Sequence, residues 1–359
     1  MELIIIGGGI IGRSASWHLQ QRGHQVTLID PDLHLETPAN PLNGSRAALG
    51  LLMAQVFHRA SGRAWRLRQR SLELWGPWVE QLRAQGHPLE LRRGLLLLAS
   101  DPIELERQQA LVQQRQALGL PLEWWDAARI KALQPELPPA LGGLWSAADG
   151  QIDPLPLLQA LGSDARRMGA RLCAQAVINL QRNADGSWRV ELANGDGLTT
   201  GTVVVCAGAS TAPLLQTLGL TLPLAAVLGQ AVELQPASAT PAWSGGPQRP
   251  AAVVWQGINL VPRPDGRLWL GATCEPGSTA DPQALEALAS LNGQAPAWLR
   301  QAQRLHQWQG VRLQPQGRAA PWLERLAPGL LLASGHYRNG LLLAPATAEW
   351  IAAQVEQPH

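Results

Sequence analysis

Three glycines near the N-terminus stand at a spacing that lets a backbone turn approach another group closely. Gly7, Gly9 and Gly12 form G-x-G-x-x-G between the apolar run "ELIII" and a segment with helical periodicity. The first glycine permits a tight turn, the second lets a pyrophosphate reach the backbone, and the third lets helix and strand pack closely. The free N–H groups at the helix start carry a partial positive charge. This pattern predicts a dinucleotide site.

A carboxylate ends the next apolar run, "QVTLID", at Asp30. That position suits hydrogen bonds with the ribose hydroxyls of an adenosine. The two runs and the helix between them predict a βαβ unit, but they do not decide between NAD and FAD. The later runs "TVVVCAGAST" and "LLLASGHYRNG" end in small residues before helical patterns, and a strand of this type far along the chain is common in FAD proteins. No second G-x-G-x-x-G is present, so a separate NADPH domain is not indicated.

Two arginines have the chemistry to bind an anion. Arg338 lies in "GHYRNG", at a predicted strand-to-helix turn, and Arg312 lies in "QGVRLQP". A planar guanidinium matches a carboxylate bidentately. A helix start at the same turn can direct N–H groups at the flavin edge where negative charge gathers on reduction. The alternatives are a surface salt bridge for Arg312 and helix capping for Arg338, and His336 is interpreted as a packing residue rather than a base.

The elements that must position these residues follow from apolar periodicity, which predicts a mixed α/β chain. The predicted helices are residues 61–84, 102–118, 127–133, 154–168, 282–303 and 340–355. The predicted strands are residues 171–182, 187–193, 202–206, 306–313 and 329–334, with a strand-rich segment at 252–273. The segment "ADGQIDP" is predicted to be a turn shaped by Asp149, followed by a helix capped by Asp153. Residues 236–250 are predicted to form a surface loop.

Length and composition favour two domains and argue against several classes of protein. A chain of 359 residues is longer than a typical domain with one hydrophobic core. The net charge of +2, without a long basic run, indicates no nucleic-acid partner. No apolar stretch reaches the roughly 18 residues of a membrane-spanning helix. Cys173, Cys206 and Cys274 stand far apart, so we expect no disulfide framework, no metal site and a cytoplasmic location.

Together the motifs resemble those of the D-amino-acid-oxidase-like FAD oxidoreductases, and among them the thiamine-pathway glycine oxidases. The strings that carry the resemblance run along nearly the whole chain: "IIIGGGIIGRSASWHLQQRGHQVTLID", "RAALGLL", "DGQIDP", "VVVCAGAST", "LVPRPDGRLWLGAT" and "GHYRNGLLLAPATA". The resemblance implies an α/β fold with a Rossmann-like FAD-binding domain of the p-hydroxybenzoate-hydroxylase-like plan and a second antiparallel-sheet substrate domain. We expect residues 1–85, 141–222 and 305–359 in the FAD-binding domain, and residues 86–140 and 223–304 in the substrate domain.

The resemblance also implies which residues bind cofactor and substrate. The implied cofactor contacts are Gly7, Gly9, Ile10, Ile11, Gly12, Asp30, Pro31, Gly44, Ser45, Leu49, Gly50, Leu51, Val177, His336, Tyr337, Arg338, Asn339, Gly340, Leu341 and Leu342. Arg312, supported by Arg338, is expected to hold the substrate carboxylate. Asn259 stands where the family usually has tyrosine and is expected to help orient the substrate. No cysteine lies near Arg312 in the sequence, so the FAD is expected to be non-covalent.

The activity implied by the resemblance is oxidative deamination of glycine or another small amino acid. The products would be an imine or 2-oxo acid, ammonia and, with oxygen as acceptor, hydrogen peroxide. The imine could instead pass to thiazole synthase. Two alternatives stay open: a D-amino-acid or secondary-amine dehydrogenase that uses another electron acceptor, and a flavin-binding protein without catalysis. Nucleic acid and membrane are not expected as partners, and a homo-oligomer is possible.

Overall fold

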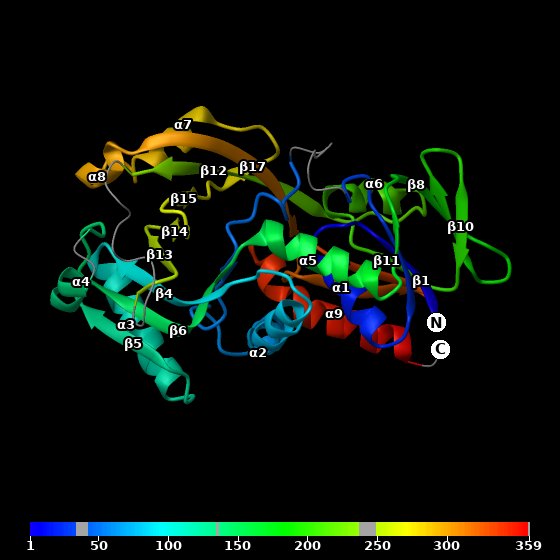
Figure 1. Ribbon diagram of the computed structural model, residues 1–359, viewed down its shortest axis with the longest axis horizontal. Coiled ribbons are helices and arrows are strands. Elements are labelled where there is room, and N and C mark those ends of the chain that lie inside the picture. The colour runs from blue at the N-terminus through cyan, green and yellow to red at the C-terminus, as the bar shows by residue number, and fades with distance from the viewer. Residues whose placement is uncertain (34–41, 134–135, 237–248, 358–359) are drawn as a thin grey trace.

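The protein is described here by a computed structural model that covers residues 1–33, 42–133, 136–236 and 249–357. The strands of these residues form sheets A, B and C, which follow one another along the long axis of the molecule (Figure 1). Sheet B lies on the left of that view, sheet A right of centre and sheet C at the right end.

Sheet A contains the βαβ unit predicted from the sequence. Its strand order is β18-β19-β11-β1-β2-β7, parallel throughout except for the β18–β19 pair. The strands are β1 (Glu2–Ile6), β2 (Gln25–Ile29), β7 (Arg171–Cys173), β11 (Val203–Val205), β18 (Trp322–Ala327) and β19 (Leu330–Ser334). A parallel sheet covered on both faces reads as unbroken apolar runs, which explains "ELIII" and "VVV".

The two faces of sheet A are covered differently. Because side chains alternate along a strand, Leu3 and Ile5 of β1 enter one core and Ile4 and Ile6 another. The first core is shared with the helices α1 (Ile10–Gln21), α2 (Gly62–Ala84), α5 (Pro154–Arg167) and α9 (Gly340–Glu356). The second is shared with sheet C and a short helix: β8 (Val177–Arg182), β9 (Trp188–Leu192), β10 (Gly197–Thr200) and α6 (Thr211–Gln216).

Sheet B is antiparallel apart from the parallel β13–β4 pair, and its order is β16-β12-β15-β14-β13-β4-β6-β3. β17 pairs with β12, and β5 pairs with β6. The strands are β3 (Leu51–Leu52), β4 (Leu91–Ala99), β5 (Leu122–Asp126), β6 (Gly142–Ile152), β12 (Leu224–Gln235), β13 (Ala252–Trp255), β14 (Ile258–Pro262), β15 (Leu268–Gly271), β16 (Glu275–Pro276) and β17 (Gln303–Pro315). The remaining helices are α3 (Pro102–Gln116), α4 (Ala127–Leu133), α7 (Pro282–Ala289), α8 (Ala297–Arg300), η1 (Gly208–Ser210) and η2 (Tyr337–Asn339).

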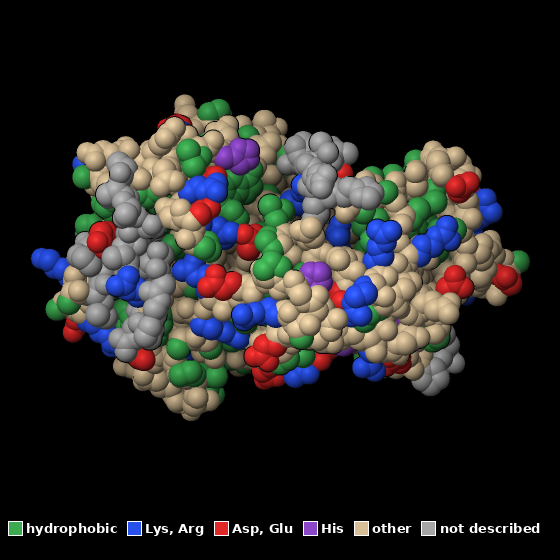
Figure 2. Space-filling view, viewed as in Figure 1, with side chains coloured by type: hydrophobic (Ala, Val, Ile, Leu, Met, Phe, Trp, Pro, Cys, Tyr) green, Lys and Arg blue, Asp and Glu red, His purple; other side chains and the backbone are tan. Residues whose placement is uncertain are grey.

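The mixed α/β class with a separate antiparallel sheet is therefore confirmed. The predicted domain ranges stay a prediction. All of β6 and most of β17 lie in ranges predicted for the FAD-binding domain, yet both strands belong to sheet B. Figure 2 shows basic and acidic side chains interspersed over the described part of the visible face. None of the helices in the described ranges combines the length and hydropathy needed to cross a bilayer.

The turn predicted at "ADGQIDP" is wrong. β6 continues to Ile152, and Asp149 lies buried within this strand. Its carboxylate accepts hydrogen bonds from the backbone N–H groups of Ala54, Gln55 and Val56. These donors come from another segment, so the hydrogen bonds of Asp149 do not require a local turn. Asp153 caps α5 as predicted, accepting a hydrogen bond from the Leu155 N–H at 3.1 Å.

Two further element predictions were also wrong in part. The helix predicted at residues 282–303 is divided into α7 and α8 by a segment with two left-handed residues, Leu291 and Asn292. The strand predicted at residues 171–182 is divided into β7 and β8. The sequence did not predict the strands β3, β5, β10, β12, β16 and β18, and most of the loop predicted at residues 236–250 lies outside the described residues.

Candidate functional site

The glycine turn has no room for side chains at two of its three positions. Gly7 has a φ of 111°, and a Cβ there would lie 2.4 Å from the carbonyl oxygen of Cys206. A Cβ on Gly12 would lie 1.8 Å from the carbonyl oxygen of Gly7. Both obstacles are backbone atoms and cannot move aside. The turn therefore has the close helix–strand packing that a dinucleotide fingerprint requires.

Two helix N-termini and a loop hydroxyl meet at this turn. The Ile10 N–H at the start of α1 donates to Ser45 Oγ at 2.9 Å, and a Cβ on Gly9 would lie 2.9 Å from that same oxygen. A Cβ on Gly340, the first residue of α9, would lie 3.8 Å from Ile10 Cγ2. Partial positive charge from both helices therefore gathers where a pyrophosphate would approach, which fits an anionic cofactor.

Asp30 is fixed at the carboxyl end of β2. Its carboxylate accepts the Gly8 N–H at 2.6 Å and the Asp32 N–H at 2.7 Å. Burial raises the pKa of Asp30, and these two hydrogen bonds oppose the rise. Pro31 beside it is exposed, and Val177 at the start of β8 is half-buried.

An arginine that sequence patterns do not single out holds this end of the turn. Arg13, buried in α1, donates to the carbonyl oxygens of Gly8 and Leu33, each at 2.7 Å. Burial is the main cause that lowers the pKa of Arg13. Gly8 also donates its N–H to Asp30, and Leu33 lies three residues after Asp30, so Arg13 fixes two segments that adjoin that carboxylate. The available signal was a cation in the first turn of a helix whose neighbouring residues are apolar or small.

The loop predicted to pass the flavin connects the glycine turn with sheet B. The Val311 N–H on β17 donates to the Leu42 carbonyl at 2.9 Å, and a Cβ on Gly44 would lie 2.6 Å from the Val311 carbonyl oxygen. Gly50 has a φ of 85° and packs against the end of β6. Leu51 pairs with β6, and Leu49 lies against Gly271 of β15. The loop thus runs from α1 to the strand that carries Arg312.

Arg312 projects over sheet B and is half-buried. A Cβ on Gly229, in the neighbouring strand β12, would lie 2.0 Å from Arg312 Nη2 and 2.4 Å from its Cζ. The guanidinium therefore occupies the space that the missing side chain of Gly229 leaves open. Arg312 Nη1 donates to the Thr273 carbonyl at 3.1 Å. Burial is the main cause that lowers the pKa of Arg312, and the nearby charge of Arg338 lowers it further.

The turn between β19 and α9 lies near Arg312. Tyr337 has a φ of 54°, and its Oη lies 3.3 Å from Cys274 Sγ. The tyrosine and the thiol both act on the pKa of Arg312, so the fold brings Cys274 beside the predicted substrate arginine although the two are distant in sequence. Arg338 is exposed on η2, and Asn339 precedes the first residue of α9.

The interpretation of His336 as a packing residue agrees with its surroundings. Its Nε2 lies 3.0 Å from Thr347 Oγ1, and burial lowers the pKa of His336 to about 3, so the ring is neutral near pH 7. Ile11, Leu341 and Leu342 are buried in the core beneath α1 and α9. Their side chains therefore contribute to the core that packs α1 and α9 together.

Asn259 is not brought into contact with Arg312. It lies on β14 and is only 5% exposed. Its Nδ2 donates to the Gly271 carbonyl oxygen on β15 at 2.7 Å. β15 and β12 lie between β14 and β17 in sheet B, so the amide is fixed two strands away from the guanidinium.

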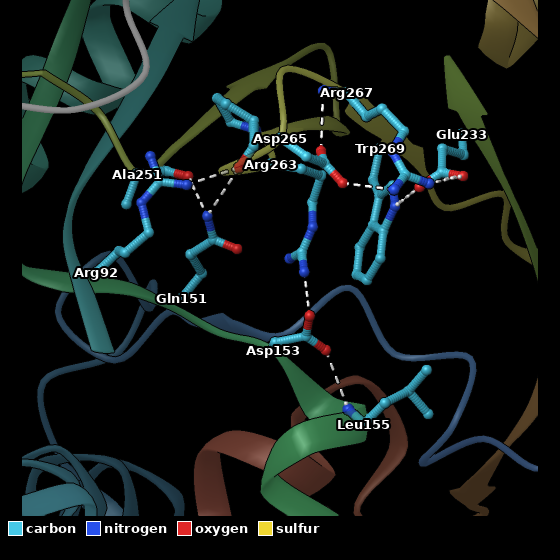
Figure 3. A network of polar contacts seen from close by, with 11 residues as sticks. Arg92, Gln151, Asp153, Leu155, Glu233, Ala251, Arg263, Asp265, Arg267 and Trp269 are labelled. Carbon is cyan, nitrogen blue, oxygen red and sulfur yellow. Dashed lines mark hydrogen bonds and ion pairs between the residues drawn. The ribbon is translucent and has the colours of Figure 1, made fainter. Parts of the chain in front are cut away.

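An ion pair ties sheet B to a helix that covers sheet A (Figure 3). Arg263, between β14 and β15, points at Asp153 at the start of α5, and its side chain is 12% exposed. The guanidinium lies 3.8 Å from the ring centre of Trp269, whose Nε1 donates to Glu233 at 2.9 Å. The motifs "DGQIDP" and "LVPRPDG" therefore meet in space, which no sequence spacing reveals.

Comparisons with known proteins identify the family of the chain. The model of a family described as "FAD dependent oxidoreductase" matches residues 2–354. Glycine oxidase from Geobacillus kaustophilus (strain HTA426) is 28% identical over 370 residues, which cover 99% of this chain and 93% of that protein. The bifunctional protein ThiO/ThiG from Synechocystis sp. is 29% identical over 366 residues, covering 98% of this chain and 51% of that protein.

Solved structures show the same relationship. The crystal structure of glycine oxidase from Geobacillus kaustophilus has a TM-score of 0.87 at 27% identity and covers 99% of this chain and 95% of that chain. Iminodiacetate oxidase from Chelativorans sp. BNC1 has a TM-score of 0.84 at 27% identity, covering 99% and 97%. The expected resemblance is confirmed. The chain belongs to the FAD-dependent oxidoreductase family, as an enzyme of the glycine oxidase kind with FAD as its cofactor.

Proposed function

We propose that this enzyme oxidatively deaminates glycine or another small amino acid. The carbon–hydrogen bond at Cα breaks, the amine becomes an imine, and water converts the imine to a 2-oxo acid and ammonia. When bound, FAD supplies the acceptor for the two electrons. Oxygen is the proposed final oxidant and becomes hydrogen peroxide. The observation that carries the proposal is the half-buried guanidinium of Arg312, held between sheet B and the β19–α9 turn.

The task of Arg312 is to bind and orient the substrate carboxylate. Its Nη1 is committed to the Thr273 carbonyl, which fixes the plane of the guanidinium. The remaining N–H groups make no hydrogen bond to the described residues and are available to a carboxylate. Partial burial strengthens such an ion pair because little water screens it. Arg338, exposed on the adjacent turn, adds positive potential without sealing the site. Orientation of Cα then supplies much of the rate.

The proposed cofactor residues fit FAD without a covalent bond. The glycine turn, the start of α1 and the start of α9 would hold the pyrophosphate and the flavin end, and Asp30 would accept hydrogen bonds from the ribose. Asp30 already accepts two backbone N–H groups, so its orientation is set before binding. Location in the cytosol and hand-over of the imine to thiazole synthase are parts of the proposal, the latter supported by similarity to proteins named ThiO/ThiG.

Glycine-dependent peroxide production by the purified, FAD-loaded protein tests the proposal. We expect flavin bleaching by glycine or another small amino acid without oxygen, and equimolar peroxide and 2-oxo acid when oxygen is present. Arg312→Lys keeps a cation but removes the planar donor pair, so it should weaken benzoate binding, read from the flavin spectrum, by about tenfold or more. If no small amino acid bleaches the flavin, the proposed activity is wrong.

A secondary amine is the second candidate substrate. Similarity to iminodiacetate oxidase over 99% of the chain supports it. Sarcosine and iminodiacetate belong in the same bleaching assay. An oxygen electrode separates an oxidase from a dehydrogenase that passes electrons to another acceptor, because only the oxidase consumes oxygen in step with substrate.

A further inference from the structure

A buried carboxylate lies behind the segment that holds Arg312. Glu275, in β16, is buried, and three groups donate hydrogen bonds to its carboxylate. The Thr273 hydroxyl and, at 3.0 Å, Gln230 Nε2 donate to Oε1, and the Asp281 N–H donates to Oε2 at 2.6 Å. Burial by itself raises the pKa of Glu275, but these hydrogen bonds and the charge of Arg312 outweigh burial and lower it. The carboxylate is therefore ionised near pH 7 and held by three donors.

Glu275 and the guanidinium of Arg312 lie on opposite faces of sheet B. Arg312 pairs with Val227 of β12, and Glu275 pairs with the next residue of that strand, Leu228. Side chains alternate along a strand and paired residues share a face, so the two side chains project from different faces. The core under α7 contains even-numbered residues of β12, so α7 covers the face of Glu275. A carboxylate bound to Arg312 therefore does not touch Glu275.

Thr273, between β15 and β16, connects the two faces. Its carbonyl oxygen accepts a hydrogen bond from Arg312 Nη1 at 3.1 Å. Its hydroxyl donates to Glu275 and accepts the Gln230 N–H at 2.7 Å, and its own N–H donates to the Gln230 carbonyl at 3.1 Å. The peptide that carries the Thr273 carbonyl lies between two anchored residues, Thr273 and Glu275. The orientation of that carbonyl, and with it the plane of the guanidinium, is therefore set from behind the sheet.

We propose that Glu275 is a positioning residue for the substrate carboxylate and acts through Thr273 on the guanidinium of Arg312. This inference rests on the proposed function, because Arg312 must hold the carboxylate. Glu275 affects a bound anion in two ways of opposite sign: its charge repels the anion, and its hydrogen bonds orient the guanidinium that attracts it. Positioning should dominate, because a misplacement of about 1 Å costs about 100-fold in rate, whereas the repulsion acts across the sheet.

Glu275→Gln removes the charge with almost no change in shape, and it turns an amide N–H toward one of the three donors. In the FAD-loaded protein we expect benzoate, read from the flavin spectrum, to bind about tenfold more weakly, and kcat/KM for the preferred amino acid to fall by about tenfold or more. Glu80→Gln, the same change at an exposed site on α2, is the control and should bind benzoate as the native protein does. Tighter benzoate binding in Glu275→Gln would show that its charge dominates and would overturn the proposal.

Two variants of Thr273 test the same path with the charge retained. Thr273→Val removes the hydroxyl and should weaken benzoate binding by about tenfold, whereas Thr273→Ser keeps the hydroxyl and should bind within about twofold of the native protein. A role in stability alone would lower the thermal midpoint of Thr273→Val and leave its benzoate binding unchanged. If Glu275→Gln does not hold FAD, the two Thr273 variants decide.

A double-mutant cycle tests whether Glu275 acts through Arg312. In an Arg312→Lys background, which lacks the planar donors that the Thr273 carbonyl orients, Glu275→Gln should change benzoate binding by less than about twofold. An equal, tenfold effect in both backgrounds would overturn the proposal. Benzoate also separates the failures: no change in the flavin spectrum of the native protein overturns the proposed function, whereas a normal native response that Glu275→Gln and Thr273→Val leave unchanged overturns only this inference.

Discussion

The position of Arg312 depends on the absence of a side chain at Gly229, and Gly229→Ala tests this directly. The new Cβ would lie 2.0 Å from Nη2, so the guanidinium must retreat by about 1.4 Å to reach an ordinary contact of 3.4 Å. The obstructing atoms are the far end of a flexible side chain, so the fold can adjust. Alanine in a strand interior also costs less backbone entropy than glycine. We therefore expect the free energy of unfolding to change by less than about 1 kcal/mol.

Function should respond very differently from stability. A misplacement of about 1 Å in a positioning group costs about 100-fold in rate, so kcat/KM for the preferred amino acid should fall by about that factor. Benzoate should bind more weakly in a titration followed by flavin absorbance, while the thermal midpoint and FAD content stay near those of the native protein. Gly201→Ala is the matched control, because a Cβ there meets nothing within 4 Å. Native-like benzoate binding and turnover in Gly229→Ala would refute the role given to this arrangement.

Three other outcomes are expected. In Gly12→Ala the Cβ would meet the Gly7 carbonyl oxygen at 1.8 Å, a backbone atom that cannot yield, so the variant should lose FAD and unfold at a lower temperature; full FAD content would contradict the assignment of the turn. Arg263→Met and Asp153→Asn should each destabilise the fold, with a coupling energy of about 1–3 kcal/mol in a double-mutant cycle of denaturant titrations, and additive effects would show that the ion pair contributes nothing. Burial lowers the pKa of His336 from 6.5 to about 3, so between these values the unfolded chain binds a proton that the folded chain does not. The contribution of His336 to the free energy of unfolding is therefore fully present above pH 6.5 and falls by about 1.4 kcal/mol per pH unit below it. In His336→Asn the free energy of unfolding should depend less on pH in this range, and an unchanged slope would contradict the role given to His336.

Local patterns predicted the parts of the site that one segment builds alone. The glycine turn, α1 and Asp30 lie within one short segment of the chain, and Gly7 and Gly12 are each required by a backbone contact, with Cys206 and with Gly7. The polar residues that lock this unit were harder to find. Arg13 has the sequence pattern of an ordinary helical arginine, and only the structure shows that its guanidinium donates to the carbonyl oxygens of Gly8 and Leu33.

The turn predicted at "ADGQIDP" shows where local patterns fail. Asp and Gly favour turns because a short polar side chain can bond the nearby backbone. Asp149 instead bonds backbone N–H groups of residues 54–56, almost a hundred positions away, and the strand continues. Tertiary hydrogen bonds therefore replaced the local ones on which the prediction depended.

The sequence by itself determined the parallel strands and the glycine turn, because apolar periodicity and glycine spacing act between residues close along the chain, and its motifs carried the resemblance to the family. Only the tertiary structure decided what surrounds Arg312. It placed Gly229 beneath the guanidinium, Cys274 and Tyr337 beside it, and it turned the Nδ2 of Asn259 onto Gly271. These contacts join strands that are distant in sequence, and the register that sets them depends on packing across whole sheets, which no short pattern encodes.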